Sequence, residues 1–160
     1  MVTSLLRKKS IYKHKRYWYH VSTTLKSKYV HLIPWDDSKG FNRDPTEPEG
    51  KRICVSPTIE QCITAIPYDL ETKINIYRTR SPVIADKPKK VFDVKVTNEG
   101  WLHNPTSFVK IGMLKFRDLE SRLNVEHVIE QAASEGEPRL SGKVLRWWKN
   151  AKIKRFIKKA

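Results

Sequence analysis

The chain has 160 residues, of which 39% are hydrophobic, and a formal net charge of +15. This length and composition suffice for one sizeable core, so we expect a single domain. No apolar run reaches the roughly 18 residues that a membrane span needs. The basic N-terminus lacks the apolar segment of a signal peptide. We therefore expect a cytoplasmic protein without a transmembrane segment, with Cys54 and Cys62 as buried free thiols.

The positive charge lies at the two ends of the chain. Residues 1–16 contain six Lys or Arg and residues 139–160 contain nine, with no acidic residue in either segment. Residues 17–138 hold 17 basic and 17 acidic residues and are neutral. The sequence thus predicts a basic N-terminal arm, a neutral body and a basic C-terminal helix. This distribution is typical of proteins that bind a polyanion, although a solubilising tail would have the same composition.

Extended segments dominate the first two thirds of the chain. Residues 17–22 and 29–33 are aromatic and β-branched, as is typical of strands. Residues 73–78 alternate polar and apolar side chains, which predicts a half-buried strand, and residues 91–96 alternate in the same way. The longest predicted strand is 108–116.

Residues 52–66 combine a strand with a helix. The first five predict a short buried strand, and Pro57 suits the first turn of a helix that has Ser56 as its N-cap. The apolar face of this helix recurs at helical spacing and consists of Ile59, Cys62, Ile63 and Ile66. A strand that leads into a capped helix presents backbone N–H groups that can bind an anion.

Two further helices are expected near the C-terminus, over residues 118–133 and 141–159. Residues 36–51 are polar and contain Gly and Pro, and we expect them to form the most mobile loop of the body. The short connections do not suit a parallel sheet. The fold class that follows is α+β, a mostly antiparallel five- to six-stranded sheet with one central helix and two C-terminal helices.

The last predicted helix interleaves basic and aromatic side chains. Its apolar stripe is broken, because Ile153 and Ile157 lie opposite the face that carries Trp147 and Trp148. We expect both Trp side chains to be at least half buried against the body and the last two turns to project. Lys and Arg side chains there can bind the phosphates of DNA or RNA, and an acidic protein surface is an equally suitable partner. The candidate binding residues are Arg146, Lys149, Lys152, Lys154, Arg155 and Lys158.

Three polar residues form a second candidate set. His20 lies in the first strand, Ser56 ahead of the central helix, and Glu99 in a turn between two late strands. They can be a hydrogen-bonded core histidine, a helix cap and a turn carboxylate. Together, however, the aromatic–His–small motif, the strand-Ser-Pro-helix unit and the late Glu resemble the ADP-ribosyltransferase-like fold. Its members include the RNA 2′-phosphotransferases and small bacterial and phage proteins, and the resemblance covers about residues 17–116.

This resemblance implies an enzyme that uses NAD to modify a protein or a nucleic acid. It implies that His20 contacts the nicotinamide ribose and that Ser56 shapes the nicotinamide pocket. Glu99 would bind a ribose hydroxyl and stabilise the oxocarbenium-like transition state as a catalytic residue. Arg52 lies where it can meet the pyrophosphate.

The sequence therefore supports two functions. The first is a small basic protein that docks nucleic acid or an acidic partner through its ends and requires no cofactor. The second is an ADP-ribosyltransferase-like enzyme with NAD. No metal site is predicted, because no His pairs with another His or a Cys at ligand spacing.

Overall fold

The computed structural model describes residues 14–36, 50–66, 69–88, 94–119 and 142–160. Within these ranges the chain forms a single α+β domain with a mostly antiparallel sheet, which confirms the predicted fold class. The strands are β1 (Tyr19–Ser22), β2 (Tyr29–Leu32), β3 (Ile53–Val55), β4 (Lys73–Thr79), β5 (Gly100–Leu102), β6 (Thr106–Lys115) and β7 (Lys158–Lys159). The helices are α1 (Ile59–Thr64), α2 (Val94–Thr97) and α5 (Gly142–Asn150), with 3₁₀ turns at Phe116–Leu119 and Ile153–Phe156.

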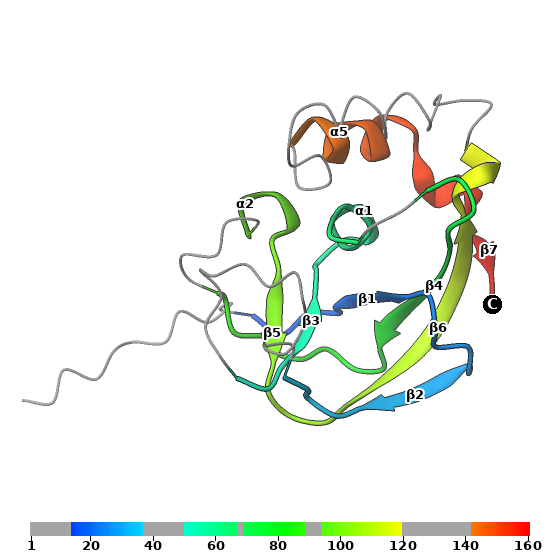
Figure 1. Cartoon of the computed structure of the whole chain (residues 1–160). Coiled ribbons are helices and arrows are strands. Elements are labelled where there is room, and N and C mark those ends of the chain that lie inside the picture. Colours follow the sequence, from blue (N-terminus) through cyan, green and yellow to red (C-terminus); the bar gives the residue numbers. More distant parts are fainter. Residues whose placement is uncertain (1–13, 37–49, 67–68, 89–93, 120–141) are drawn as a thin grey trace, which may run out of the picture.

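The larger sheet has the strand order β1-β4-β6-β2, and β7 also pairs with β6. Strands β3 and β5 form a second, two-stranded sheet. The residues that flank β3 reach both edges of the larger sheet through backbone bridges. Ser56 pairs with Tyr19 of β1, and Arg52 pairs with Trp35 beyond β2. The strands therefore wrap around a common interior, and α1 and α5 lie over one side of the sheet (Figure 1).

Two apolar clusters fill the molecule. One lies between the sheet and the helices and includes Ile63, Ile76 and Trp148. The other lies within the wrapped strands and includes Trp18 and Phe108. Successive side chains of a strand point to opposite faces, so β4 can supply both clusters from alternate positions.

This placement corrects the prediction of a half-buried β4. Ile74 and Ile76 face the first cluster and Tyr77 faces the second, and all three are fully buried. The first cluster covers one face of β4 and the second covers the other, so both faces are buried over residues 74–77. Alternating polarity over residues 73–78 therefore does not indicate a solvent-exposed face.

Helix α1 is confirmed, but its N-cap is not Ser56. The cap is Thr58, which has an extended backbone and whose side chain accepts a hydrogen bond from the Gln61 N–H. Ser56 instead continues the strand, with its backbone paired to Tyr19. The predicted strand over 91–96 is also wrong in its described part, because Val94–Thr97 is the helical turn α2.

The C-terminal helix is shorter than predicted. Helix α5 ends at Asn150, and Lys152 takes the left-handed conformation with φ 53° and ψ 50°. The chain turns there, which brings Ile153 into the core although it lies on the opposite face of an ideal helix. Trp148 is fully buried and Trp147 partly buried against the same cluster, as predicted. The expectation that the last turns project is wrong, because the break in the apolar stripe marks a change of direction.

Several predictions lie outside the described residues. They are the N-terminal arm up to residue 13, the loop over residues 37–49 and the helix from residue 120 onward. Within the described ranges, no helix is long and apolar enough to cross a membrane.

Candidate functional site

A group of polar side chains collects on one face of the small β3–β5 sheet. Arg52, Cys54 and Ser56 occupy alternate positions of one extended segment and share a face. Cys54 lies opposite Trp101 of β5. The Trp101 Nε1–H donates to Glu99 Oε1 at 2.6 Å. We call these five residues the β3–β5 polar cluster.

The electrostatics of the cluster centre on the Cys54 thiol. The side chains of Glu99 and Arg52 both hydrogen-bond to it. Burial raises the pKa of Cys54 well above 9.0, and the nearby Glu99 carboxylate adds to this, while Arg52 opposes it. The Arg52 guanidinium lies 4.2 Å from the centre of the Trp101 ring, a cation–π contact. The Glu99 carboxylate and the Arg52 guanidinium thus flank the Cys54 thiol, whose raised pKa keeps it protonated.

The cluster is almost closed to solvent. Arg52, Ser56 and Glu99 are only 4%, 3% and 8% exposed. Burying charged groups is costly unless they are paired and hydrogen-bonded, and the contacts to Cys54 and Trp101 provide such partners. Cys62 of α1 adds a second thiol, whose pKa burial raises to about 12 although Ser56 hydrogen-bonds to it. Both cysteines are free, as predicted.

Local backbone geometry delivers Glu99 to this cluster. Asn98 has a positive φ of 48°, a conformation that Asn tolerates better than most residues. Its N–H bonds to the Val94 carbonyl at 2.9 Å, which ends α2. The chain then reverses into β5, so that Glu99 and Trp101 lie two residues apart on one face.

His20 approaches the same strand from its edge. Its Nδ1 is 3.0 Å from the Cys54 carbonyl oxygen, and since a carbonyl only accepts, Nδ1 carries the proton. Burial lowers the pKa of His20 below 6.5, with the Cys54 hydrogen bond opposing the shift, so the ring is a neutral donor near pH 7. The ring also contacts Trp35 and Phe108, with centroids 6.1 and 5.9 Å apart.

The predicted set is therefore only partly assembled. Arg52, Ser56 and Glu99 share one face of the β3–β5 sheet. The His20 side chain, like that of Trp18, points toward the apolar cluster that includes Phe108. Ser56 is paired with Tyr19, which precedes His20 in β1 and therefore points to the opposite face. His20 thus meets the β3–β5 polar cluster at the backbone carbonyl of Cys54 and not with its side chains.

Sequence reasoning missed two members of the cluster. Cys54 was interpreted only as a buried thiol, and Trp101 was not identified as a site residue. The alternation of Arg52, Cys54 and Ser56 would have placed the thiol with the other two. The spacing of two residues between Glu99 and Trp101 carries the same signal.

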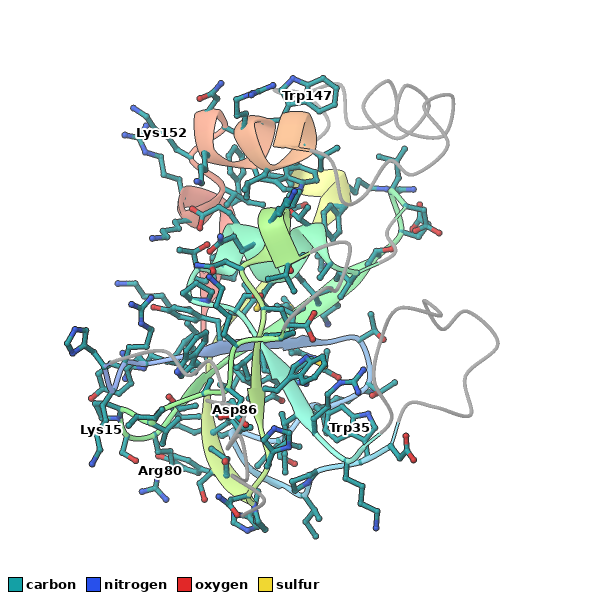
Figure 2. The ribbon with its side chains drawn as sticks, turned by 90° about the vertical axis from the view of Figure 1, so that its left-hand side faces the viewer. Lys15, Trp35, Arg80, Asp86, Trp147 and Lys152 are labelled. Carbon is teal, nitrogen blue, oxygen red and sulfur yellow. The ribbon has the colours of Figure 1, made fainter. Side chains whose placement is uncertain are left out.

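The second candidate site is the C-terminal segment. Its exposed basic residues are Arg146, Lys149, Lys152, Lys154, Arg155, Lys158 and Lys159, which we call the C-terminal basic surface. Buried Val144, Trp148 and Ile153 anchor the segment to the body. Among described residues, its one ion pair joins Lys158 to Asp118 at 3.8 Å. Lys152 and Lys15, from the two basic ends, project from the same side of the molecule in Figure 2.

Within the described part of the chain, no group of three His, Cys, Asp or Glu side chains can hold a metal ion. Comparison of the whole chain with protein-family models, with curated proteins and with solved structures found no match.

Proposed function

We propose that this protein binds nucleic acid through the C-terminal basic surface. The observation that carries the proposal is that seven exposed Lys and Arg side chains project from a segment anchored by buried Val144, Trp148 and Ile153. A folded scaffold fixes their spacing before binding, so less conformational entropy is lost when phosphates are bound. Each phosphate contact also releases condensed counterions.

The composition of the surface favours a polyanion over an isolated anionic group. The basic residues span a helix, a 3₁₀ turn and a short strand, so they cover an extended area. In the described part of the segment only Lys158 has a carboxylate partner. Lys15 and Arg16 at the other basic end are exposed as well. An acidic protein is the competing partner.

Neutral substitution tests the proposal without disturbing the fold. Lys149, Lys154 and Arg155 are exposed, so changing all three to Gln removes charge but no packing. Binding to a labelled oligonucleotide should weaken, and the slope of log K against log salt should become shallower by about 2 to 3, since each lost phosphate contact removes about 0.7 to 0.9. Deletion of the segment is not a clean test, because it would also remove buried Ile153.

The matched control changes three exposed lysines elsewhere, Lys51, Lys73 and Lys95, to Gln. It has the same net charge as the test variant. Equal losses in both variants would mean that net charge alone governs binding. Unchanged binding by the test variant would reject the C-terminal surface, and equally tight binding to poly-glutamate would indicate an acidic protein partner.

A second candidate function is the NAD-dependent transfer implied by the resemblance. It is supported by the grouping of Arg52, Ser56 and Glu99 on one face, although they are distant in sequence. The fit to NAD is poor, because these side chains are nearly closed to solvent and His20 lies on the other face.

The enzyme proposal is tested by nicotinamide release. Wild-type protein would be incubated with millimolar NAD and candidate acceptors, beside a Glu99→Gln variant that keeps the side-chain shape. Release by the wild type alone supports the enzyme. No release and no NAD binding by calorimetry would leave the binding proposal as the only one.

A further inference from the structure

A second basic surface lies on the sheet, at the end remote from α5. Residues directly opposite one another in antiparallel strands point to the same face. In the first row Arg78 of β4 lies opposite Val109 of β6, which lies opposite Tyr29 of β2. In the next row Ser107 lies opposite His31 of β2.

Arg80 completes this second row. Its backbone N–H donates to the Ser107 carbonyl at 2.9 Å, which continues the pairing of β4 with β6 by one residue. The Ser107 hydroxyl is hydrogen-bonded to His31 Nδ1 at 2.9 Å. Arg80 lies far from Trp147 and α5, on the side of the molecule where Lys15 also projects (Figure 2).

Aromatic rings and guanidinium groups alternate across this face. The Arg78 guanidinium lies 4.5 Å from the centre of the Tyr17 ring, and that of Arg80 lies 5.4 Å from the centre of the Tyr29 ring. Lys28 also approaches Tyr29, at 5.6 Å. We call Tyr17, Tyr29, His31, Arg78 and Arg80 the sheet platform.

Four of the five platform side chains are exposed, whereas Arg78 is half-buried, and the positive charge of the platform is not neutralised. Tyr17 is 41% exposed and Tyr29 58% exposed, and His31 and Arg80 are exposed too. Neither Arg78 nor Arg80 forms an ion pair with another described residue. Exposed tyrosine rings beside guanidinium groups offer a ligand both a stacking surface and positive charge.

We infer that the sheet platform binds single-stranded nucleic acid, with bases stacked on Tyr17 and Tyr29 and the phosphates beside Arg78 and Arg80. Aromatic rings on a sheet, together with arginines, are suited to unstacked bases, which expose both of their faces. In a duplex the bases are stacked on one another, so the rings cannot reach them. An acidic protein would use the arginines but gain nothing specific from two exposed rings.

The geometry requires two different bases. Tyr17 lies beside β1 and Tyr29 lies on β2, which are separated by three strand spacings in the order β1-β4-β6-β2. At about 4.8 Å for each spacing, the backbone positions of Tyr17 and Tyr29 are about 14 Å apart across the sheet. One base cannot contact both, and the nucleic-acid backbone between two stacked bases would pass over the arginines.

This inference rests on the proposed function only for the class of partner, since the residues and the kind of contact differ. The test is fluorescence anisotropy with a labelled oligothymidylate of about 12 nucleotides and with a duplex of the same length. The variants are Tyr17→Ala and Tyr29→Ala, each beside the Tyr→Phe change that keeps the ring. Ile84→Ala, at another exposed apolar side chain, is the control.

Each Tyr→Ala change should weaken single-strand binding roughly 5- to 100-fold, the loss expected for one stacked base. The Phe variants and the Ile84 control should stay within about twofold of wild type, since ring stacking survives. The salt slope should remain unchanged, because no charge is removed. Duplex binding should also be unchanged, and an unchanged melting temperature would show that the exposed substitutions leave the fold intact.

Three results would overturn the inference. One is wild-type affinity for the single strand in both Ala variants. Another is an equal loss for single strand and duplex, and the third is an equal loss in the Phe variants. If binding then still depends on Lys149, Lys154 and Arg155, the proposed function stands without the platform. Failure of the wild type to bind either oligonucleotide would reject both.

Discussion

Among substitutions on the buried face of α5, Trp148→Ala should cause one of the largest losses in the free energy of unfolding. Trp148 is 0% exposed and its ring packs against Phe116, with centroids 5.7 Å apart and planes at 62°. A buried Trp removes roughly 200 Å² from water, worth about 5 kcal/mol at about 25 cal/mol per Å². Measured Trp→Ala losses in cores are about 3 to 5 kcal/mol, which agrees with this figure.

The assay is thermal unfolding followed by circular dichroism, with urea unfolding as a second measurement. For a chain of this size, each kcal/mol shifts the melting temperature by about 2 to 4 °C, so a loss of about 3 to 5 kcal/mol in Trp148→Ala should lower it by roughly 6 to 20 °C. The adjacent Trp147→Ala is the matched control. Because Trp147 is only partly buried at the edge of the same cluster, its loss should stay near about 1 kcal/mol.

Equal losses in the two Ala variants would refute the reasoning, since the argument depends on their different burial. A loss below about 1.5 kcal/mol for Trp148→Ala would refute it too. If the Ala variant does not fold, Trp148→Phe can be measured instead. It retains a ring beside Phe116 and should lose less, yet still more than Trp147→Phe.

Three further outcomes are expected. A Cβ at Gly112 would collide with Ile157 and lie 2.9 Å from the Lys158 carbonyl oxygen, so Gly112→Ala should speed amide exchange in β7 by mass spectrometry, whereas Gly142→Ala, with nothing within 4 Å, should not. Burial lowers the pKa of His20 below 6.5, so on acidification this side chain takes up a proton more readily in the unfolded chain than in the folded one. Stability should therefore fall as the pH drops below about 6.5, by up to about 1.4 kcal/mol per pH unit, and His20→Gln should flatten this dependence in urea titrations. Burial raises the pKa of Cys62 to about 12 and that of Cys54 well above 9.0, so a thiol reagent at about pH 8 should label neither until the protein unfolds. Fast labelling of native protein would contradict this.

The parts of the fold that could be predicted from the sequence are those governed by local periodicity. Ile59 and Ile63 repeat at helical spacing and form the buried face of α1. The apolar run around Phe108 predicted the longest strand, and β6 is the longest described strand. In both places one dominant local pattern agrees with the tertiary environment.

Local patterns failed where a polar side chain is buried against backbone. Asn75 looked solvent-exposed, but its Nδ2 donates to the Leu25 carbonyl at 2.7 Å. The Tyr77 hydroxyl likewise donates to the Ser27 carbonyl at 3.0 Å. Hydrogen bonds to these distant carbonyls offset the cost of burying the Asn75 amide and the Tyr77 hydroxyl. The face of β4 that the alternating pattern predicted to be exposed to solvent is therefore covered.

Arg52, Ser56 and Glu99 of the candidate site could be predicted from the sequence, but the roles of Cys54 and Trp101 and the arrangement of the five could not. The pairing of β3 with β5 brings Glu99 to Cys54, and no local pattern encodes a contact over that separation. The left-handed turn at Lys152 was equally hidden, because Lys lacks the conformational signature that Gly would give. That turn decides how the C-terminal basic surface is presented.

The pairing partners of β6 also set the order in which the chain can fold during synthesis. Strand β2 pairs with residues 106–109 of β6, and β1 pairs with β4 rather than with a near neighbour. A nascent chain that has emerged only through β3 thus holds three strands, none of which has its principal partner available. Sheets built from such distant pairings fold slowly, because loop closure precedes the stabilising contacts. The hydrogen-bonding edges of β1 and β3 stay unprotected until β4 and β5 have emerged, and that of β2 stays unprotected until β6 has emerged. Unpaired strand edges of this kind favour aggregation.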